Sequence, residues 1–244
     1  MTNYYKKLGQ LLDWLQNYKE RTNCKGVVLG ISGGKDSTVV AMLAKKVWGD
    51  NVLGILMPNG EQADIGDSID IVTKLKLSFW NVNIGDTYSA LISEIVNNQK
   101  VSDKAKTNIP PRLRMTTLYA IAQTIGFQVI GTGNADERYL GWFTKWGDGA
   151  CDFNPIGNLT CTEVIEIGKI LAEEFKLPLK YIEKTPSDGL TGKSDEDNFG
   201  FTYKQAEDII SGNIYNCTAE TLGKVVRMNK STEHKRNPIP MAEF

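Results

Sequence analysis

The chain has 244 residues, 41% of them hydrophobic, which is enough to bury the core of one α/β domain. Its 28 basic and 29 acidic residues nearly cancel, and no run approaches the roughly 20 apolar residues that span a bilayer, so we expect no nucleic-acid partner, no membrane partner and a cytoplasmic location. Four scattered cysteines and a single histidine support neither a disulfide framework nor a zinc site.

A helix, a strand and a second helix are predicted at the start of the chain. Apolar residues recur at helical spacing from Tyr4 to Tyr18, which predicts a helix over about residues 3–21. Residues 27–29 form a short run typical of a buried strand, and residues 38–44 have helix-forming content. The glycines between these two runs therefore stand where a strand ends and a helix begins, a place where free N–H groups face an anion.

This glycine turn reads Gly30-Ile31-Ser32-Gly33-Gly34-Lys35-Asp36-Ser37-Thr38. The Walker A pattern fails because Asp36 follows the Gly-Lys pair, and the dinucleotide pattern fails because Ser32 stands where a glycine is required. The remaining pattern, Ser-Gly-Gly-x-Asp-Ser, resembles the loop of the ATP pyrophosphatases, which cut ATP between its α- and β-phosphates. That resemblance implies that serines and backbone amides hold the pyrophosphate and that Asp36 helps to hold a divalent metal. On the residues alone, the turn also fits a flexible helix cap.

Strands and helices then alternate along the chain. Strands are predicted over residues 52–57, 78–82 and 127–133, helices over 65–75, 84–96 and 112–125, and a polar loop over 97–111. Such alternation predicts an α/β fold with a doubly wound parallel sheet.

The fourth strand runs into a second glycine turn, Gly131-Thr132-Gly133. In doubly wound sheets, ligands bind at the carboxyl ends of the strands where the strand order reverses. The two glycine turns face each other across one crevice if the first and fourth strands are neighbours. We therefore predict a strand order of 3-2-1-4.

The second half of the chain alternates irregular and helical segments. Residues 141–157 form a long aromatic loop with little periodicity, and such loops are more often functional than structural. Helices are predicted over 161–174, 203–210 and 219–228, irregular structure over 180–200, and a charged, proline-interrupted mobile tail over 231–244.

Five motifs, in order along nearly the whole chain, resemble the NAD synthetases of the ammonia-dependent type. They are Ser32–Ser37, Arg112–Met115, Gly131–Asn134 with Glu137, Phe143–Gly149 and Thr232–Arg236. The resemblance implies an adenine nucleotide alpha hydrolase-like fold, a single NAD synthetase domain over residues 1–244, and a homodimer. Within the domain it implies an N-terminal helix at about 3–21, an ATP pyrophosphatase core at about 25–175 and a substrate-covering segment at about 180–244.

The same resemblance implies an ATP- and Mg²⁺-dependent amidation of deamido-NAD (nicotinic acid adenine dinucleotide) by ammonia. The substrate carboxylate attacks the α-phosphate of ATP, pyrophosphate leaves, and ammonia displaces AMP from the acyl adenylate to form NAD. Glutamine-dependent relatives carry an N-terminal amidase domain, whereas only about 30 residues precede the glycine turn in this sequence. Free ammonia is therefore the expected nitrogen donor, unless a separate amidase docks.

The resemblance also implies roles for individual residues. Asp36 and Glu137 are expected to hold Mg²⁺, and Asp36 and Lys145 are the expected catalytic residues. Contacts to deamido-NAD are expected from Arg112, Lys145, Asp152, His234 and Lys235. Contacts to ATP are expected from Gly30, Ser32, Gly33, Gly34, Lys35, Ser37, Thr132 and Ser187.

One departure from the family pattern leaves alternatives open. Cys161 stands where the family usually carries a lysine that helps to hold the ATP phosphates, so either Lys35 or Lys169 supplies this charge or nucleotide affinity is lower. A cysteine beside the site also fits an adenylating sulfurtransferase that modifies tRNA, although the sequence has no paired C-x-x-C and no basic RNA-binding appendage. A non-catalytic ATP-binding module, with little or no ATP turnover, is the second alternative.

Overall fold

The computed structural model describes residues 3–61, 65–184, 194–215 and 217–242. Its strands form one parallel sheet in the order β3-β2-β1-β4, as the sequence predicts. The strands are β1 (Val27–Gly30), β2 (Val52–Leu56), β3 (Ser78–Asn81) and β4 (Gln128–Val129). Because β1 lies between β2 and β4, the carboxyl ends of β1 and β4 are neighbours and the strand order reverses between them.

Helices connect the strands and continue beyond them. The first five are α1 (Tyr4–Thr22), α2 (Lys35–Trp48), α3 (Ile65–Lys74), α4 (Gly85–Val96) and α5 (Asp103–Ile125). The remaining helices are α6 (Ala135–Leu140), α7 (Cys161–Phe175), α8 (Asp195–Phe199), α9 (Tyr203–Ile210) and α10 (Ala219–Ser231), with short 3₁₀ turns η1 (Leu179–Tyr181) and η2 (Glu233–Lys235). Among the described residues, no helix combines the length and the apolar character required to cross a membrane.

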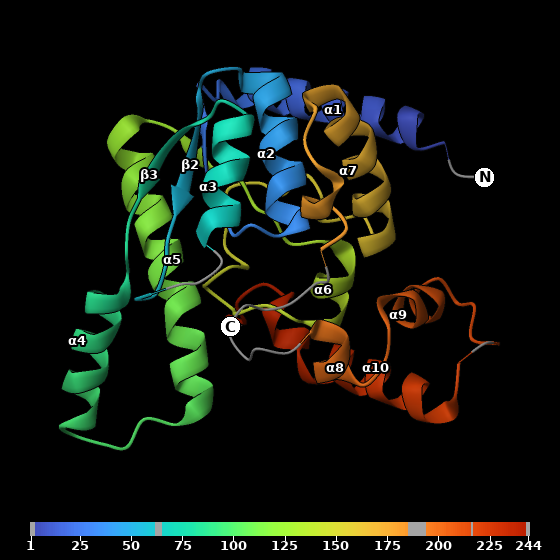
Figure 1. Cartoon of the computed structure of the whole chain (residues 1–244). Helices are drawn as coiled ribbons and strands as arrows, with labels where there is room; N and C mark the ends of the chain where they lie inside the picture. Colours follow the sequence, from blue (N-terminus) through green and yellow to red (C-terminus); the bar gives the residue numbers. More distant parts are fainter. Residues whose placement is uncertain (1–2, 62–64, 185–193, 216, 243–244) are drawn as a thin grey trace.

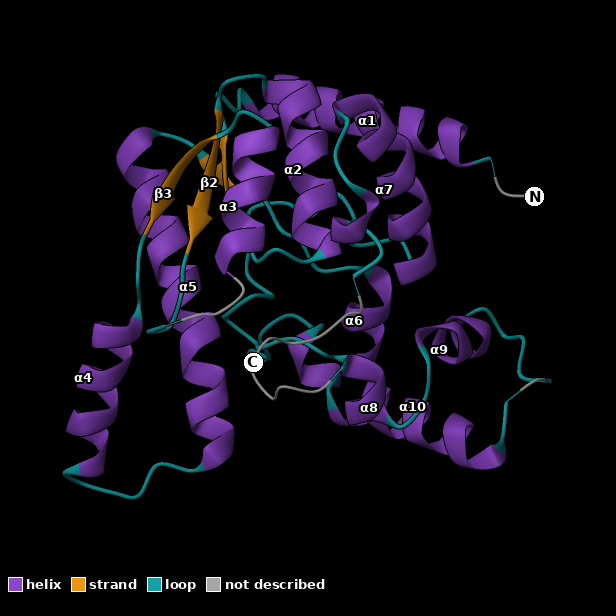
Figure 2. Cartoon of the chain, in the orientation of Figure 1, coloured by secondary structure: helices purple, strands orange, loops and turns teal. Residues whose placement is uncertain are grey.

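The sheet is covered by helices on both faces, and alternate strand residues point to opposite faces. Val27 and Leu29 of β1 join the larger core with residues of α1, α2, α3 and α7. Val28 joins a second core on the opposite face, together with Leu53, Ile55 and the inner side of α5. Figure 1 and Figure 2 show the sheet between α5 on one side and α3 and α2 on the other. The sheet is therefore buried on both faces, and the turns that follow β1 and β4 lie at the carboxyl ends of these strands.

A third apolar core lies outside the sheet and belongs to the C-terminal helices. Phe199, Phe201 and Tyr203 pack against Leu140 of α6 and against α10. In Figure 1 the helices α8 and α10 lie below α6, and α9 lies beside α6 and below α7. This C-terminal core therefore holds the last quarter of the chain against the elements that follow β4.

The predicted polar loop over 97–111 is wrong from residue 103 onward, because α5 begins at Asp103 and includes Pro110 and Pro111. Each proline removes one N–H donor from the helix, which usually ends it. Both prolines are buried, and Pro111 lies against Gly147, where an added Cβ would come within 3.0 Å of it. Ser102 caps the helix by accepting a hydrogen bond from the Ala105 N–H. Tertiary burial and a good cap thus offset the local cost of the prolines.

The segment predicted as irregular over 180–200 contains helix α8. Ser194 and Asp197 form a reciprocal capping box at its start, and Gly200 ends it in the left-handed conformation. The sequence Ser-x-x-Asp carries this signal, but the five-residue helix is too short to show an apolar period. The predicted tail over 231–244 is also ordered in part, since η2 contacts the loop that follows α6.

Candidate functional site

The first glycine turn lies at the carboxyl end of β1 and forms a cradle of polar groups. Gly33 adopts a positive φ of 78°, and an added Cβ there would come within 3.2 Å of Asp67. The hydroxyl oxygens of Ser32 and Ser37 lie 3.1 Å apart, and the Gly34 N–H donates to Ser32 Oγ at 3.3 Å. Only glycine fits this backbone shape at position 33 without strain.

The start of α2 lacks the side-chain cap that most other helices of the described chain possess. Gly34 is its N-cap residue and has no side chain to accept a hydrogen bond from the first turn. By contrast, α6, α7, α8 and α9 each begin with a reciprocal capping box. The first-turn amides of α2 are therefore left for another acceptor, and an anion such as a phosphate is the ligand that suits them.

The second glycine turn faces the cradle, and Asn134 joins the two. This buried residue donates from Nδ2 to Asp36 Oδ1 at 3.2 Å. Its backbone N–H donates to Glu137 Oε2 at 3.0 Å, and its Oδ1 accepts from the Glu137 N–H at 3.0 Å. One residue thus contacts both carboxylates, through its side chain for Asp36 and its backbone for Glu137, and the two glycine turns lie next to each other as the strand order implies.

The two carboxylates share one buried cation. Lys35 is 3% exposed, and its Nζ lies 2.7 Å from Asp36 Oδ2. Burial alone would lower the pKa of Lys35, but the Asp36 and Glu137 carboxylates hold it above its ordinary value. Burial and the charge of Asp36 raise the pKa of Glu137 well above its usual range, and Lys35 opposes this change. A divalent cation beside these two carboxylates would favour their charged forms.

The donor set fits Mg²⁺ better than a softer metal. Asp36 and Glu137 offer carboxylate oxygens, and no sulfur or imidazole ligand accompanies them in the contacts described. Within the described ranges, no cluster of three or more potential ligands could hold a metal on its own. Mg²⁺ is usually held by one or two carboxylates together with substrate phosphates, which matches two carboxylates beside a phosphate cradle.

A second group of functional candidates, Arg112, Lys145, His234 and Lys235, lies at the far end of α6 and is termed the basic group. Lys145 Nζ donates to the His234 carbonyl at 2.6 Å, and Arg112 Nε donates to the Lys145 carbonyl at 3.3 Å. Lys235 Nζ donates to the carbonyls of Gly141 and Phe143 at 2.7 and 2.6 Å. The structure therefore brings these four residues together, and it attaches the end of the chain to the aromatic loop.

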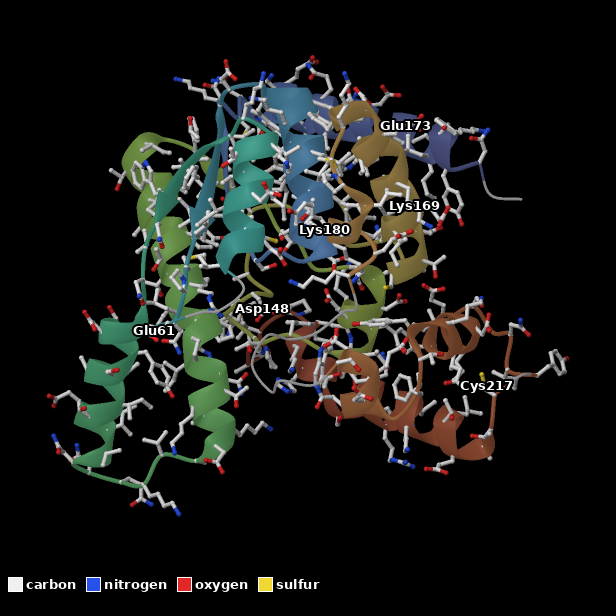
Figure 3. All side chains as sticks on the ribbon, viewed as in Figure 1. Glu61, Asp148, Lys169, Glu173, Lys180 and Cys217 are labelled. Atoms are coloured by element: carbon white, nitrogen blue, oxygen red, sulfur yellow. The ribbon has the colours of Figure 1, made fainter. Side chains whose placement is uncertain are left out.

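The basic group carries an excess of positive charge. Burial lowers the pKa of Lys235; Asp148 opposes this change, while Lys104, Arg236 and Arg112 add to it. Asp148 lies near the centre of the view in Figure 3 and accepts a hydrogen bond from the Thr144 N–H at 2.9 Å. Glu137 is the third residue of α6, and the three helical residues after it, about 4.5 Å of helix, lead to Gly141, whose carbonyl Lys235 contacts. The arrangement can hold a phosphate chain at one end and a second anionic ligand at the other.

The other predicted site residues have different surroundings. Asp152 accepts from the Val129 N–H at 2.7 Å and from the Tyr119 hydroxyl at 3.3 Å, so its described contacts do not join it to the basic group. Thr132 follows β4 in the second turn, and Gly30 is the last residue of β1 in the cradle. Ser187 lies outside the described residues.

Of the two lysines considered as a substitute for the family lysine, Lys35 is the one near Cys161. Lys35 lies close enough to Cys161 for their charges to interact, whereas Lys169 pairs with Glu166 at 2.9 Å on the surface. Burial raises the pKa of the Cys161 thiol to about 12, so almost no thiolate forms at neutral pH. A protonated, buried thiol is a poor nucleophile, which argues against the sulfur-transfer alternative.

Two residues at the site were not among the sequence-based candidates. Asn134 was part of a motif, and its spacing to Glu137 is that of a capping box, which could have identified it. Tyr203 of α9 was not detectable, since its ring reaches 5.7 Å from Lys35 Nζ only through the packing of the C-terminal core.

Known proteins resemble this chain over nearly its whole length. The profile of the family described as NAD synthase matches residues 7–239. An NH(3)-dependent NAD(+) synthetase from Carboxydothermus hydrogenoformans is 42% identical over 246 aligned residues, which cover 98% of this chain and 98% of that protein.

Two solved structures agree with this match. NMN synthetase from Francisella tularensis has a TM-score of 0.91 at 33% identity, over 100% of both chains. The NH3-dependent NAD synthetase from Campylobacter jejuni has a TM-score of 0.81 at 26% identity, also over 100% of both chains. The chain therefore belongs to the NAD synthase family, and its parallel sheet is of the adenine nucleotide alpha hydrolase type.

Proposed function

We propose that this protein amidates deamido-NAD with ammonia, using ATP and Mg²⁺, and forms NAD, AMP and pyrophosphate. One observation carries the proposal within this family: Asn134 joins Asp36 of the cradle to Glu137 of the second turn where the strand order reverses. This arrangement places two carboxylates beside an uncapped helix start. It is suited to a nucleotide triphosphate with its metal ion.

At the nucleotide end, the cradle binds the phosphates that leave as pyrophosphate. The first-turn amides of α2 and the hydroxyls of Ser32 and Ser37 donate to phosphate oxygens, with Gly33 and Gly34 allowing close approach. Thr132 and Ser187 contribute further ATP contacts. Asp36 and Glu137 would hold Mg²⁺, which would neutralise negative charge on the phosphates. Fixed donors of this kind stabilise the leaving pyrophosphate without reorganisation.

At the substrate end, the basic group binds and orients deamido-NAD. Arg112, Lys145, His234 and Lys235 offer positive charge and donors to its phosphates and its nicotinate carboxylate. Lys145 acts next to the reacting carboxylate and stabilises the charge on the α-phosphate during attack. Asp152 accepts hydrogen bonds from substrate hydroxyl groups. A substrate held this way meets the α-phosphate in line, which lowers the entropic cost of the reaction.

The two chemical steps are needed because a free carboxylate is a poor acyl donor. Direct attack by ammonia would have to expel oxide, whereas attack on the acyl adenylate expels AMP. The proton released from ammonia must leave the site, and water must be kept from the adenylate in the meantime. The C-terminal segment, attached over the aromatic loop by Lys235, is placed to exclude that water.

We further propose a homodimer and a cytoplasmic location, where ATP is available. The edge strand β3 and helix α4 expose a group of large apolar side chains, Phe79, Trp80, Leu91, Ile95 and Val96. Exposed edges and patches of this kind are commonly covered by a partner chain. Light scattering after size-exclusion chromatography should give twice the chain mass, and a Trp80→Lys variant should shift toward the monomer.

The activity is tested by product analysis. The protein is incubated with ATP, Mg²⁺, ammonium and deamido-NAD, and we expect equal amounts of NAD and AMP. Formation of ADP, or no product, would overturn the proposal and favour the non-catalytic ATP-binding alternative. Glutamine in place of ammonium should give far less product if free ammonia is the donor.

A second candidate substrate is nicotinic acid mononucleotide, which the same amidation would convert to NMN. The observation that favours it is the TM-score of 0.91 with the NMN synthetase from Francisella tularensis. The ratio of kcat/KM for the two substrates decides between them. A ratio above one for deamido-NAD supports the first proposal, and a ratio below one supports the second.

A further inference from the structure

The ammonium group of Lys35 is enclosed by four helices in the middle of the site. Its Nζ lies 2.7 Å from Asp36 Oδ2 on α2, and the ring centroid of Tyr203 on α9 lies 5.7 Å from it. Glu137 of α6 and Cys161 of α7 lie close enough to act on its charge. The Lys35 side chain is 3% exposed, so its charge needs a carboxylate partner, and Asp36 is the one it contacts.

Both oxygens of Asp36 are engaged in this arrangement. Oδ1 accepts from Asn134 Nδ2 at 3.2 Å, and Oδ2 accepts from Lys35 Nζ. A divalent cation bound to Oδ2 would lie next to the ammonium group, and two cations at such short range repel each other strongly. Lys35 and the metal ion therefore compete for the same carboxylate.

The charge balance points the same way. Asp36 paired with Lys35 has no net charge, whereas Asp36 without the ammonium group would offer one negative charge to a cation. Removal of the ammonium group from Asp36 requires another anionic partner, because an unpaired buried charge is strongly unfavourable. A phosphate chain in the adjacent cradle is such a partner, since Lys35 is itself the first residue of α2.

We propose that Lys35 is an internal counter-cation that occupies Asp36 until ATP binds, so that the divalent metal enters with the nucleotide and not before it. When the phosphates occupy the cradle, the ammonium group moves from Asp36 Oδ2 to a phosphate oxygen, and the released carboxylate binds the metal. This inference rests on the proposed function in one respect, namely that the cradle binds ATP with a divalent metal.

Lys169 provides a matched control for substitutions of Lys35. It lies on α7, and its ammonium group pairs with Glu166 at 2.9 Å and Glu183 at 3.7 Å. Figure 3 shows Lys169 near Glu173 on α7, away from the centre of the molecule where Asp148 lies. The side chain is 39% exposed, so its replacement changes the same type of charge without touching the cradle.

The test measures Mn²⁺ binding to the nucleotide-free full-length protein, using the electron paramagnetic resonance signal of free Mn²⁺. Lys35→Met should bind Mn²⁺ about tenfold more tightly than the wild type, or better, because the competing cation is gone. Lys169→Met should bind Mn²⁺ like the wild type. The double variant Lys35→Met with Asp36→Asn should lose the gain, which assigns the Mn²⁺ to this carboxylate.

The ATP analogue with a methylene group between its α- and β-phosphates completes the test. In the wild type, the bound analogue should tighten Mn²⁺ binding about tenfold beyond the value expected if the two ligands bound independently. Lys35→Met should lose this synergy. If Lys35→Met does not fold, Lys35→Gln serves as the second variant. The synergy in the wild type needs no variant, and its absence overturns the inference.

Two failures can be told apart. If the wild type makes NAD and Asp36→Asn weakens Mn²⁺ binding, but Lys35→Met binds Mn²⁺ no more tightly than the wild type, the inference about Lys35 is wrong and the proposed function stands. If Asp36→Asn leaves Mn²⁺ binding unchanged and no NAD forms, the proposed function fails, and the inference fails with it.

Discussion

The cradle and the basic group are the two ends of one site, and they are built in different ways. The polar contacts between residues of the cradle join positions at most five apart, such as Ser32 and Ser37, and Asp36 alone of these residues is described with a side-chain contact to the second turn. The contacts of the basic group join residues far apart in sequence: Lys145 and His234 are 89 positions apart, and Lys235 and Gly141 are 94 apart. A local turn is specified by its own residues, whereas the basic group exists only after the C-terminal core has formed. Substitutions at the two ends of the site should therefore affect different measured properties of the protein.

The largest effect is expected at the cradle. Asp36→Asn removes the charge of the proposed metal ligand and keeps its shape, so turnover should fall by about a thousandfold or more. Asp50→Asn is the control, since Asp50 is fully exposed and pairs with Lys45 at the surface. The measurement is the steady-state rate of NAD formation. Retention of near wild-type turnover in Asp36→Asn would refute the metal role.

The second effect concerns α6, the helix that joins the two ends. Burial raises the pKa of Asp136 to about 7, with nearby Glu207 adding to the change and the Cys161 N–H opposing it. The unfolded chain releases this proton near the ordinary pKa of 3.8, whereas the folded chain retains it to about pH 7. The free energy of unfolding should therefore decrease as pH rises through this window and level off above it.

Asp136→Asn removes this titration and keeps an acceptor for the Cys161 N–H. Relative to the wild type, the variant should gain stability between pH 5 and pH 8, on the order of 2 kcal/mol. Urea unfolding at several pH values measures the difference. A difference that does not change with pH would contradict the raised pKa of Asp136.

The third effect tests the backbone of the cradle. Gly33→Ala places a Cβ at a φ of 78° and within 3.2 Å of Asp67, so it should destabilise the fold by about 1–2 kcal/mol and weaken ATP binding. Gly9→Ala is the control, because Gly9 lies inside α1 with no atom within 4 Å of the added Cβ. The control should be neutral or stabilising by up to about 1 kcal/mol. If Gly33→Ala and Gly9→Ala change the thermal stability equally, position 33 has no special requirement for glycine.

The smallest effect is expected at the basic group. Lys235→Met removes the two hydrogen bonds to the aromatic loop and should raise KM for deamido-NAD about tenfold, with KM for ATP unchanged. Lys230→Met, at an exposed position of α10, is the control. If KM for ATP rises equally, the two ends of the site are not separable, and the comparison between them is wrong.

Much of the fold was predictable because its signals are local. The alternation of buried strands with amphipathic helices predicts the parallel sheet, and two glycine turns after β1 and β4 predict the order 3-2-1-4. The cradle was predictable for the same reason, since its residues are consecutive and Gly33 is required by its own backbone conformation. The start of α5 was not predictable, because Pro110 and Pro111 oppose a helix locally and only their burial overrides this preference.

By itself, the sequence determined most of the elements, the strand order and the position of the glycine turn that forms the cradle, since each depends on neighbouring residues and on simple rules of chain connection. Only the tertiary structure decided that Asn134 holds Asp36 and Glu137 together, that Lys35 and not Lys169 lies beside Cys161, and that Lys235 attaches the end of the chain to the aromatic loop. These outcomes depend on which distant side chains share one buried space. Unpaired charges and donors are costly in a buried space, so they must find partners there. The local sequence does not show which distant residues those partners are.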